Sequence, residues 1–117
     1  MRLYISGPMT DIPQYNAPAF EQAAKELRDR GHEVTSPPEL DNGQDGSVWD
    51  FIARDLKIIA SDAIEAVVVL PGWQNSKGAR LEVLTALMLK KQVYYFYTWT
   101  LLDPEYTMRM MKRSIEI

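Results

Sequence analysis

Residues 66–70 form an uninterrupted run of apolar, largely β-branched side chains, Ala66-Val67-Val68-Val69-Leu70. The run lacks the polar–apolar alternation of a half-exposed strand, and it is typical of a strand that is buried on both faces. Such strands belong to parallel sheets that are covered by helices on both sides. This segment therefore constrains the fold more than any other part of the chain, and it favours the α/β class.

The rest of the chain alternates strands with helices, as βαβ units require. Further strands are predicted at 3–6, 32–36 and 92–97, and helices are predicted at 17–30, 48–62 and 78–91. At 117 residues the chain is expected to be one domain, residues 1–117. We therefore predict a three-layer, doubly wound parallel sheet of about four or five strands, of the flavodoxin- or Rossmann-like type.

Local signals place several of the boundaries. Asn16 is a predicted N-cap with Pro18 in the first helical turn, and Gly31 suits the position just beyond the end of that helix. Residues 40–47 are polar and rich in glycine, so we expect a loop there. Ser47 at the end of this loop is a predicted cap for the next helix.

Residues 98–117 form a C-terminal extension whose structure is the hardest to predict. Within it, Asp103-Pro104-Glu105 indicates the start of a helix, and several methionines follow. Together with the aromatic run at 94–99, these methionines offer more apolar surface than a small monomer easily hides. We therefore expect a homodimer or a larger homo-oligomer, in which the methionines of the extension pack either on their own domain or at a subunit interface.

Composition excludes several kinds of function. The net charge of −3 argues against a nucleic-acid partner. The chain has no cysteine and a single histidine, His32, which excludes thiolate and His-rich metal sites and a Ser-His-Asp triad. Residues 1–6 lack the hydrophobic stretch of a signal peptide, and no apolar run approaches the about 20 residues that span a membrane. We expect a cytoplasmic protein with no membrane partner.

Glu82 is the only charged residue in the run 81–89, which is otherwise almost entirely apolar. A helix so apolar is normally buried on most sides, and a buried carboxylate is costly unless another group pairs with it or uses it. The helix follows a polar, Gly-containing loop at 71–78, directly after the buried strand 66–70. In open α/β sheets, ligands bind at the carboxyl ends of the strands, where this acid is expected.

Two loops are expected to meet at that position, one after strand 3–6 and one after strand 66–70. Glycines in both allow the backbone to approach a ligand closely, and the N-terminus of helix 78–91 favours an anion such as phosphate. From these loops we expect substrate or phosphate contacts from Ser6, Gly7, Pro8, Met9, Trp73, Asn75, Ser76 and Gly78.

Asp55 is a candidate second carboxylate. It lies four residues after Phe51 on the predicted helix 48–62, so the two side chains share one face. Two carboxylates that flank a sugar are the usual arrangement for cleaving a glycosidic bond. One serves as nucleophile or electrostatic stabiliser, and the other assists the leaving group.

Four segments in order resemble the nucleoside 2-deoxyribosyltransferase-like family, and within it the branch called DUF4406. The segments are Tyr4-Ile5-Ser6-Gly7-Pro8-Met9, Arg54-Asp55-Leu56, Ala66-Val67-Val68-Val69-Leu70 and Ser76-Lys77-Gly78-Ala79-Arg80-Leu81-Glu82. The resemblance covers about the first ninety-five residues.

This resemblance implies roles for three side chains. Glu82 matches the nucleophile that attacks the anomeric carbon of the sugar, and Tyr4 matches the tyrosine that orients it. Asp55 matches the aspartate that contacts the base and helps it leave. The implied reaction is cleavage or transfer of an N-glycosidic bond through a covalent glycosyl-Glu intermediate, with no metal or organic cofactor.

The resemblance also bears on the substrate. Ser76 precedes Glu82 by six residues, where transferases of free nucleosides carry an aspartate and hydrolases of nucleoside 5′-monophosphates carry a serine that contacts phosphate. Ser76 therefore implies a nucleotide N-glycosidase. Pro8 stands where the hydrolases place a second phosphate-binding hydroxyl, and loop 72–76 has the form typical of DUF4406. The base, the sugar and the choice between hydrolysis and transfer are left open.

Each of these residues also has a structural interpretation. Glu82 would complement the dipole of its helix, Tyr4 would fill the core, and Ser76 would cap a helix. Asp55 would form a surface ion pair with a neighbour such as Lys57 or Arg54. A second hypothesis for function is a module that binds or senses a nucleotide or an ADP-ribose-like ligand without turnover. A third is an interaction protein in which residues 94–99 and the methionine-rich extension serve assembly.

Overall fold

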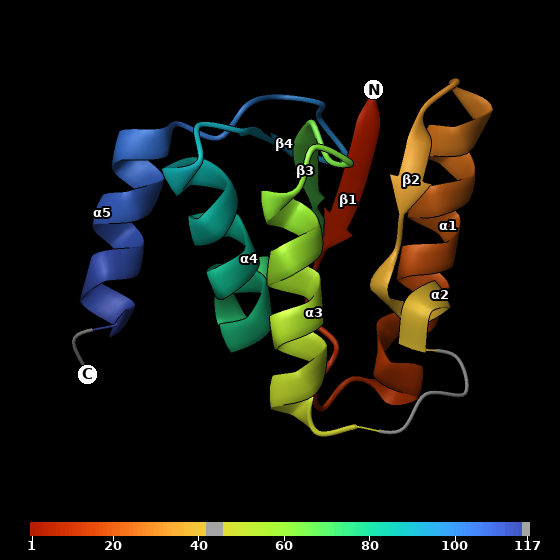
Figure 1. The fold of residues 1–117 in the computed structure, drawn as a ribbon, viewed down its shortest axis with the longest axis horizontal. Coiled ribbons are helices and arrows are strands. Elements are labelled where there is room, and N and C mark those ends of the chain that lie inside the picture. Colours follow the sequence, from red (N-terminus) through yellow and green to blue (C-terminus); the bar gives the residue numbers. More distant parts are fainter. Residues whose placement is uncertain (42–45, 116–117) are drawn as a thin grey trace.

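The computed structural model describes residues 1–41 and 46–115. Within these residues a sheet of four parallel strands has the order β2-β1-β3-β4 (Figure 1). The strands are β1 (Arg2–Ser6), β2 (Glu33–Thr35), β3 (Ala66–Val69) and β4 (Gln92–Tyr95). The α/β class and the parallel, Rossmann-like sheet are therefore confirmed.

Strands β1 and β3 lie side by side in the middle of the sheet. Their register pairs Leu3 with Ala66 and Ser6 with Val69, so both strands end at the same level. The chain leaves β1 towards β2 on one side and later returns to β3 on the other side. The loops after β1 and β3 therefore begin at the topological switch point, where a ligand is expected.

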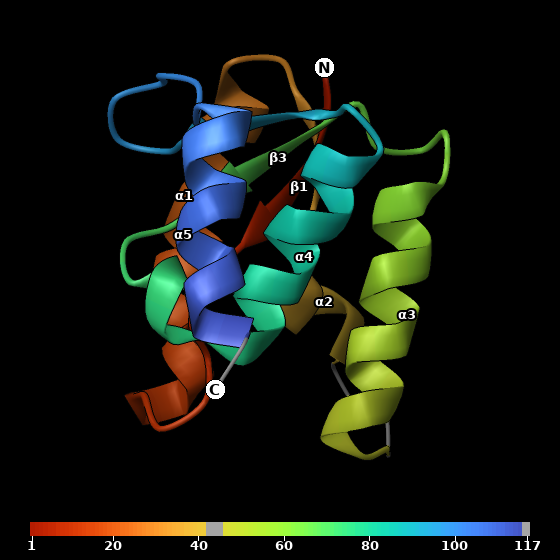
Figure 2. The same cartoon turned by 90° about the vertical axis from the view of Figure 1, so that its left-hand side faces the viewer.

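Helices cover both faces of the sheet. Helix α1 (Ala17–Asp29) lies on one face, and α3 (Val48–Ala60), α4 (Lys77–Met88) and α5 (Pro104–Ile115) lie on the other (Figures 1 and 2). Alternate residues of β3 point to the two sides: Ala66 and Val68 pack in the cluster with α1, and Val67 and Val69 pack in the cluster with α3 to α5. The prediction that 66–70 is buried on both faces is confirmed.

Three local features differ from the sequence prediction. A short helix α2 (Pro37–Asp41) extends into the segment 40–47, which was predicted to be a loop. Residues 42–45 of that segment lie outside the described part of the chain. Short 3₁₀ turns, η1 (Pro13–Asn16) and η2 (Trp73–Asn75), shape the loops after β1 and β3. These pieces are too short to produce a hydrophobic periodicity in the sequence.

Asn16 precedes α1 as predicted, but the prediction that its side chain caps the helix is wrong. Its backbone is left-handed (φ 62°), and its Nδ2 donates to the Pro8 carbonyl at 2.9 Å instead. The side chain therefore ties the loop after β1 to itself. By contrast, Ser47 forms the predicted cap of α3 and exchanges hydrogen bonds with Asp50 in a capping box.

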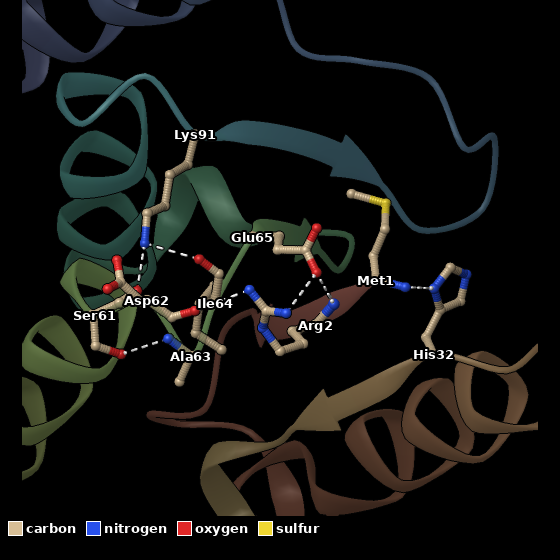
Figure 3. A network of polar contacts seen from close by, with 9 residues as sticks. All are labelled: Met1, Arg2, His32, Ser61, Asp62, Ala63, Ile64, Glu65 and Lys91. Atoms are coloured by element: carbon tan, nitrogen blue, oxygen red, sulfur yellow. Dashed lines mark hydrogen bonds and ion pairs between the residues drawn. The ribbon is translucent and has the colours of Figure 1, made fainter.

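Polar contacts stabilise the other end of the sheet, where the strands begin, far from the switch point (Figure 3). Lys91 donates from Nζ to the carbonyls of Ile59, Ser61 and Ile64 at 2.6, 2.7 and 2.8 Å. Two of these carbonyls belong to the C-terminal end of α3, where a cation is favourable. This contact joins the start of β4 to the turn between α3 and β3.

We expect Lys91→Met to lower the free energy of unfolding by about 2–3 kcal/mol, because three carbonyls lose a charged donor. Urea denaturation followed by circular dichroism measures this loss. Lys57→Met is the matched control, since Lys57 is an exposed lysine of α3. Equal stability of the two variants would show that the contact contributes nothing.

Candidate active site

Glu82 lies in the second turn of α4, on the side that faces β1. The helix begins after Ser76, whose Oγ accepts from the Ala79 backbone N–H at 3.2 Å. Apolar neighbours Ala79, Val83 and Ala86 pack in the core and carry Glu82 in with them, so that its side chain is only 7% exposed. Glu82 is therefore a buried acid, as its apolar surroundings in the sequence predict.

Two hydroxyl groups from β1 hold the carboxylate of Glu82. The hydroxyl of Tyr4 donates to Oε2, and Ser6 Oγ donates to Oε1 at 2.7 Å. Positions 4 and 6 point to the same side of the strand because side chains alternate between faces. Among the described residues, Glu82 forms no ion pair, so these hydroxyls are its defining partners.

Asp55 lies on α3 and is also buried. Its Oδ1 accepts from Arg54 Nε at 3.0 Å and from Arg54 Nη2 at 2.8 Å. The same Nη2 lies 2.6 Å from Oδ1 of Asp41 at the end of α2. Asp55 thus combines the burial expected of a site residue with the ion pair that its structural interpretation predicts.

Burial dominates the titration of both acids. It raises the pKa of Glu82 to about 8, against the hydrogen bonds from Tyr4 and Ser6, and the charge of Asp55 raises it further. Burial also raises the pKa of Asp55, and the contacts with Arg54 oppose this rise. The pKa of Tyr4 lies well above its usual value because of burial and the nearby Glu82 and Asp55. Tyr4 is therefore a hydrogen-bond donor at neutral pH.

The raised pKa of Glu82 predicts a characteristic dependence of stability on pH. Between about pH 4.5 and pH 8 the folded state keeps a proton that the unfolded chain has lost, so stability falls as pH rises. Glu82→Gln removes this titration. We expect its melting temperature to exceed that of the wild type by a margin that grows from pH 5 to pH 8, as measured by calorimetry. A constant difference over that range would contradict the assignment.

Glycine is required where the loop after β1 passes the end of β3. A Cβ on Gly7 would lie 3.0 Å from the Cβ of Leu70, so any larger residue would push the loop outwards. Gly72 adopts a left-handed conformation with φ 84°, which favours glycine at that turn. The two loops can therefore lie close together at the switch point.

The other predicted contact residues lie in these same loops. Pro8 and Met9 are half-buried after β1, Ser76 and Gly78 are half-buried at the start of α4, and Asn75 is exposed. The N-terminus of α4 carries free backbone N–H groups of the kind that bind anions. These positions are compatible with contacts to a substrate or phosphate.

Two of the predicted contact residues, Ser6 and Trp73, are almost completely buried. Ser6 is fully buried, and its Oγ donates to Glu82. Trp73 is 2% exposed and packs in the core, so its ring is not open for a base to stack on it. Its edge forms part of a recess of about 520 Å³ with Tyr95 and Tyr97, which does not include Glu82.

Sequence reasoning considered Arg54 only as a surface ion-pair partner of Asp55, and it missed Asp41 altogether. Arg54 stands beside Asp55 in the sequence, but adjacent helical residues do not normally face each other. Asp41 belongs to the short helix α2, which the pattern did not predict. The signal that was available is the basic residue next to a buried acid.

In the part of the chain that the structure covers, no group of three or more potential metal-ligating side chains is found. Helices long and apolar enough to cross a bilayer are likewise missing from residues 1–41 and 46–115.

Comparison with protein families matches residues 1–95 to the model of DUF4406, described as a domain of unknown function. This match includes all the acids and hydroxyls described above. A search of curated proteins found no match to the chain.

Proposed function

The chain belongs to the DUF4406 family, and we propose that it cleaves or transfers the N-glycosidic bond of a nucleotide or nucleoside. The observation that carries this proposal is the buried Glu82, held by two hydroxyl donors beside a second buried acid at the switch point of the sheet. A carboxylate fixed in this way is suited to covalent catalysis on a sugar.

In the proposed reaction, an oxygen of Glu82 attacks C1′ of the sugar and the bond to the base breaks. Asp55 assists the departure of the base, and the hydroxyls of Tyr4 and Ser6 keep the Glu82 carboxylate in place. Water or an acceptor base then releases the sugar from Glu82. Two displacements at the same carbon give net retention, for which the two carboxyl groups are expected about 5–5.5 Å apart.

The resemblance to the nucleoside 2-deoxyribosyltransferase-like family supports this reaction and reduces the number of candidate substrate classes. Ser76 is half-buried at the N-terminus of α4, where a hydroxyl and free N–H groups would bind a 5′-phosphate. We therefore place nucleoside 5′-monophosphates ahead of free nucleosides. A role in capping does not compete with this function, because the Ser76 hydroxyl can accept from Ala79 and donate to a phosphate.

A panel of nucleoside monophosphates and nucleosides, with chromatographic detection of free base, tests the proposal. Release of a base, with the sugar product formed in the retained configuration, would support it. Tight binding by calorimetry with no product from any member of the panel would overturn it in favour of a nucleotide-binding module.

We also propose that the chain forms a homodimer or a larger homo-oligomer. Large apolar side chains at the end of α4 and in and before α5 are exposed, among them Met88, Leu89, Leu101 and Tyr106. Light scattering of the purified chain tests this proposal, and a monomeric mass would contradict it.

A further inference from the structure

Within the described residues, Arg54 is the cation that pairs with acids of the candidate site. Arg54 donates through Nε and Nη2 to Asp55 and through Nη2 to Asp41, so that a single guanidinium lies between α3 and α2. Its Cζ also lies 5.2 Å from the centre of the Phe51 ring. These contacts fix the guanidinium on the Asp55 side of the acid pair, because Glu82 is held by hydroxyls instead.

Two buried acids in one site do not ionise independently. When two carboxyl groups interact in a shared environment, one ionises first and the pair retains a proton to higher pH. The groups around each acid decide which one keeps that proton. Tyr4 and Ser6 of β1 and Asp55 of α3 surround Glu82, whereas Arg54, Tyr4, Glu82 and Asp41 of α2 surround Asp55.

We propose that Arg54 is a positioning residue that keeps Asp55 ionised and thereby leaves the shared proton on Glu82 while the site is empty. A guanidinium with two N–H groups on one carboxylate oxygen stabilises the charged form more than neutral hydroxyls do. Asp41 holds the same guanidinium from α2 and thus fixes its position beside Asp55.

The catalytic meaning of this arrangement rests on the proposed function. A nucleophilic Glu82 must be ionised, and an Asp55 that assists the base must carry a proton. The proton therefore passes from an oxygen of Glu82 to an oxygen of Asp55 when the substrate enters, and no other reactant is needed. This transfer makes both acids ready in a single step.

Carboxyl-carbon NMR titration of the isotopically labelled, ligand-free chain tests the proposal without requiring turnover. In the wild type we expect Asp55 to ionise at a lower pH than Glu82. In Arg54→Met we expect the midpoint of Asp55 to rise by about one pH unit or more, and the order of the two acids to reverse. Arg2→Met is the control, because Arg2 pairs with Glu65 at the opposite end of the sheet.

Two results would overturn the proposal: Glu82 ionising before Asp55 in the wild type, or titration curves in Arg54→Met that superpose on those of the wild type. If Arg54→Met does not fold, Arg54→Lys and the wild-type order decide the question, since lysine keeps the charge but loses the fork of two N–H groups. If Asp55 ionises before Glu82 but no base is released from any substrate, the proposed function is refuted and the role of Arg54 is not. Base release with the opposite order would refute the role of Arg54 alone.

Discussion

Glu82→Gln is expected to reduce release of the base by about 10³-fold or more, because the amide cannot form the covalent bond to C1′. Glutamine has nearly the shape of glutamate and still accepts one hydrogen bond through its carbonyl oxygen. One of the Tyr4 and Ser6 hydroxyls still donates to this oxygen, and the other can accept from the amide NH2, so the fold should persist. Chromatographic measurement of initial rates, with circular dichroism of each sample, separates lost chemistry from lost structure.

The matched control is Glu21→Gln, which makes the same change on the exposed face of α1. It should retain the wild-type rate. A sharper version uses Glu82→Ala with added formate, in which a small carboxylate takes the place of the missing side chain. Partial recovery of base release by formate is expected, and a Glu82→Gln variant with the full wild-type rate would refute covalent catalysis by this residue.

The fold could be predicted to a large extent because its strongest signals are local. The run 66–70 can be satisfied only by burial on both faces. Ser47 marks the start of a helix through its side chain, and Gly31 marks the end of another through its left-handed backbone. The short helix α2 and the left-handed backbone of Asn16 were not predicted. Asn16 donates to the Pro8 carbonyl, and Glu39 of α2 pairs with Arg28. These contacts follow neither the helix nor the strand period, so they do not appear in a local hydrophobic pattern.

The candidate site could be predicted in part for the same reason. Glu82 stands out because an acid among apolar residues conflicts with its surroundings, and this conflict is visible in the sequence. Tyr4 came only from the family resemblance, and its contact with Glu82 joins residues 78 positions apart. Arg54 was considered only as a surface partner of Asp55, because its second contact is with Asp41, 13 positions away in the sequence. Residues that hold other site residues in place are therefore the hardest to recognise from the sequence.

Asp55→Asn is expected to lower the rate by about 10²–10³-fold for substrates with ordinary bases, which is the usual range for loss of an acid–base group. Asparagine keeps the size of the side chain and can still accept from Arg54, so the contact with α2 through Asp41 remains. What is lost is the proton that neutralises the departing base. The kinetic effect should therefore depend on how much the leaving group needs that proton.

This dependence distinguishes an acid from a merely structural Asp55. Some substrate analogues, such as a 7-methylpurine nucleotide, have a leaving group that departs without a proton. For such an analogue, Asp55→Asn should lower the rate of base release by less than about 10-fold, because general-acid catalysis does not contribute to that rate. Glu82→Gln should lower the rate of base release equally for both substrates, since each reaction needs the covalent bond to C1′. The test therefore compares four rates, one for each substrate in each variant. If Asp55→Asn lowers the rate equally for both substrates, Asp55 holds Arg54 and the rest of the site in position and takes no part in the chemical step.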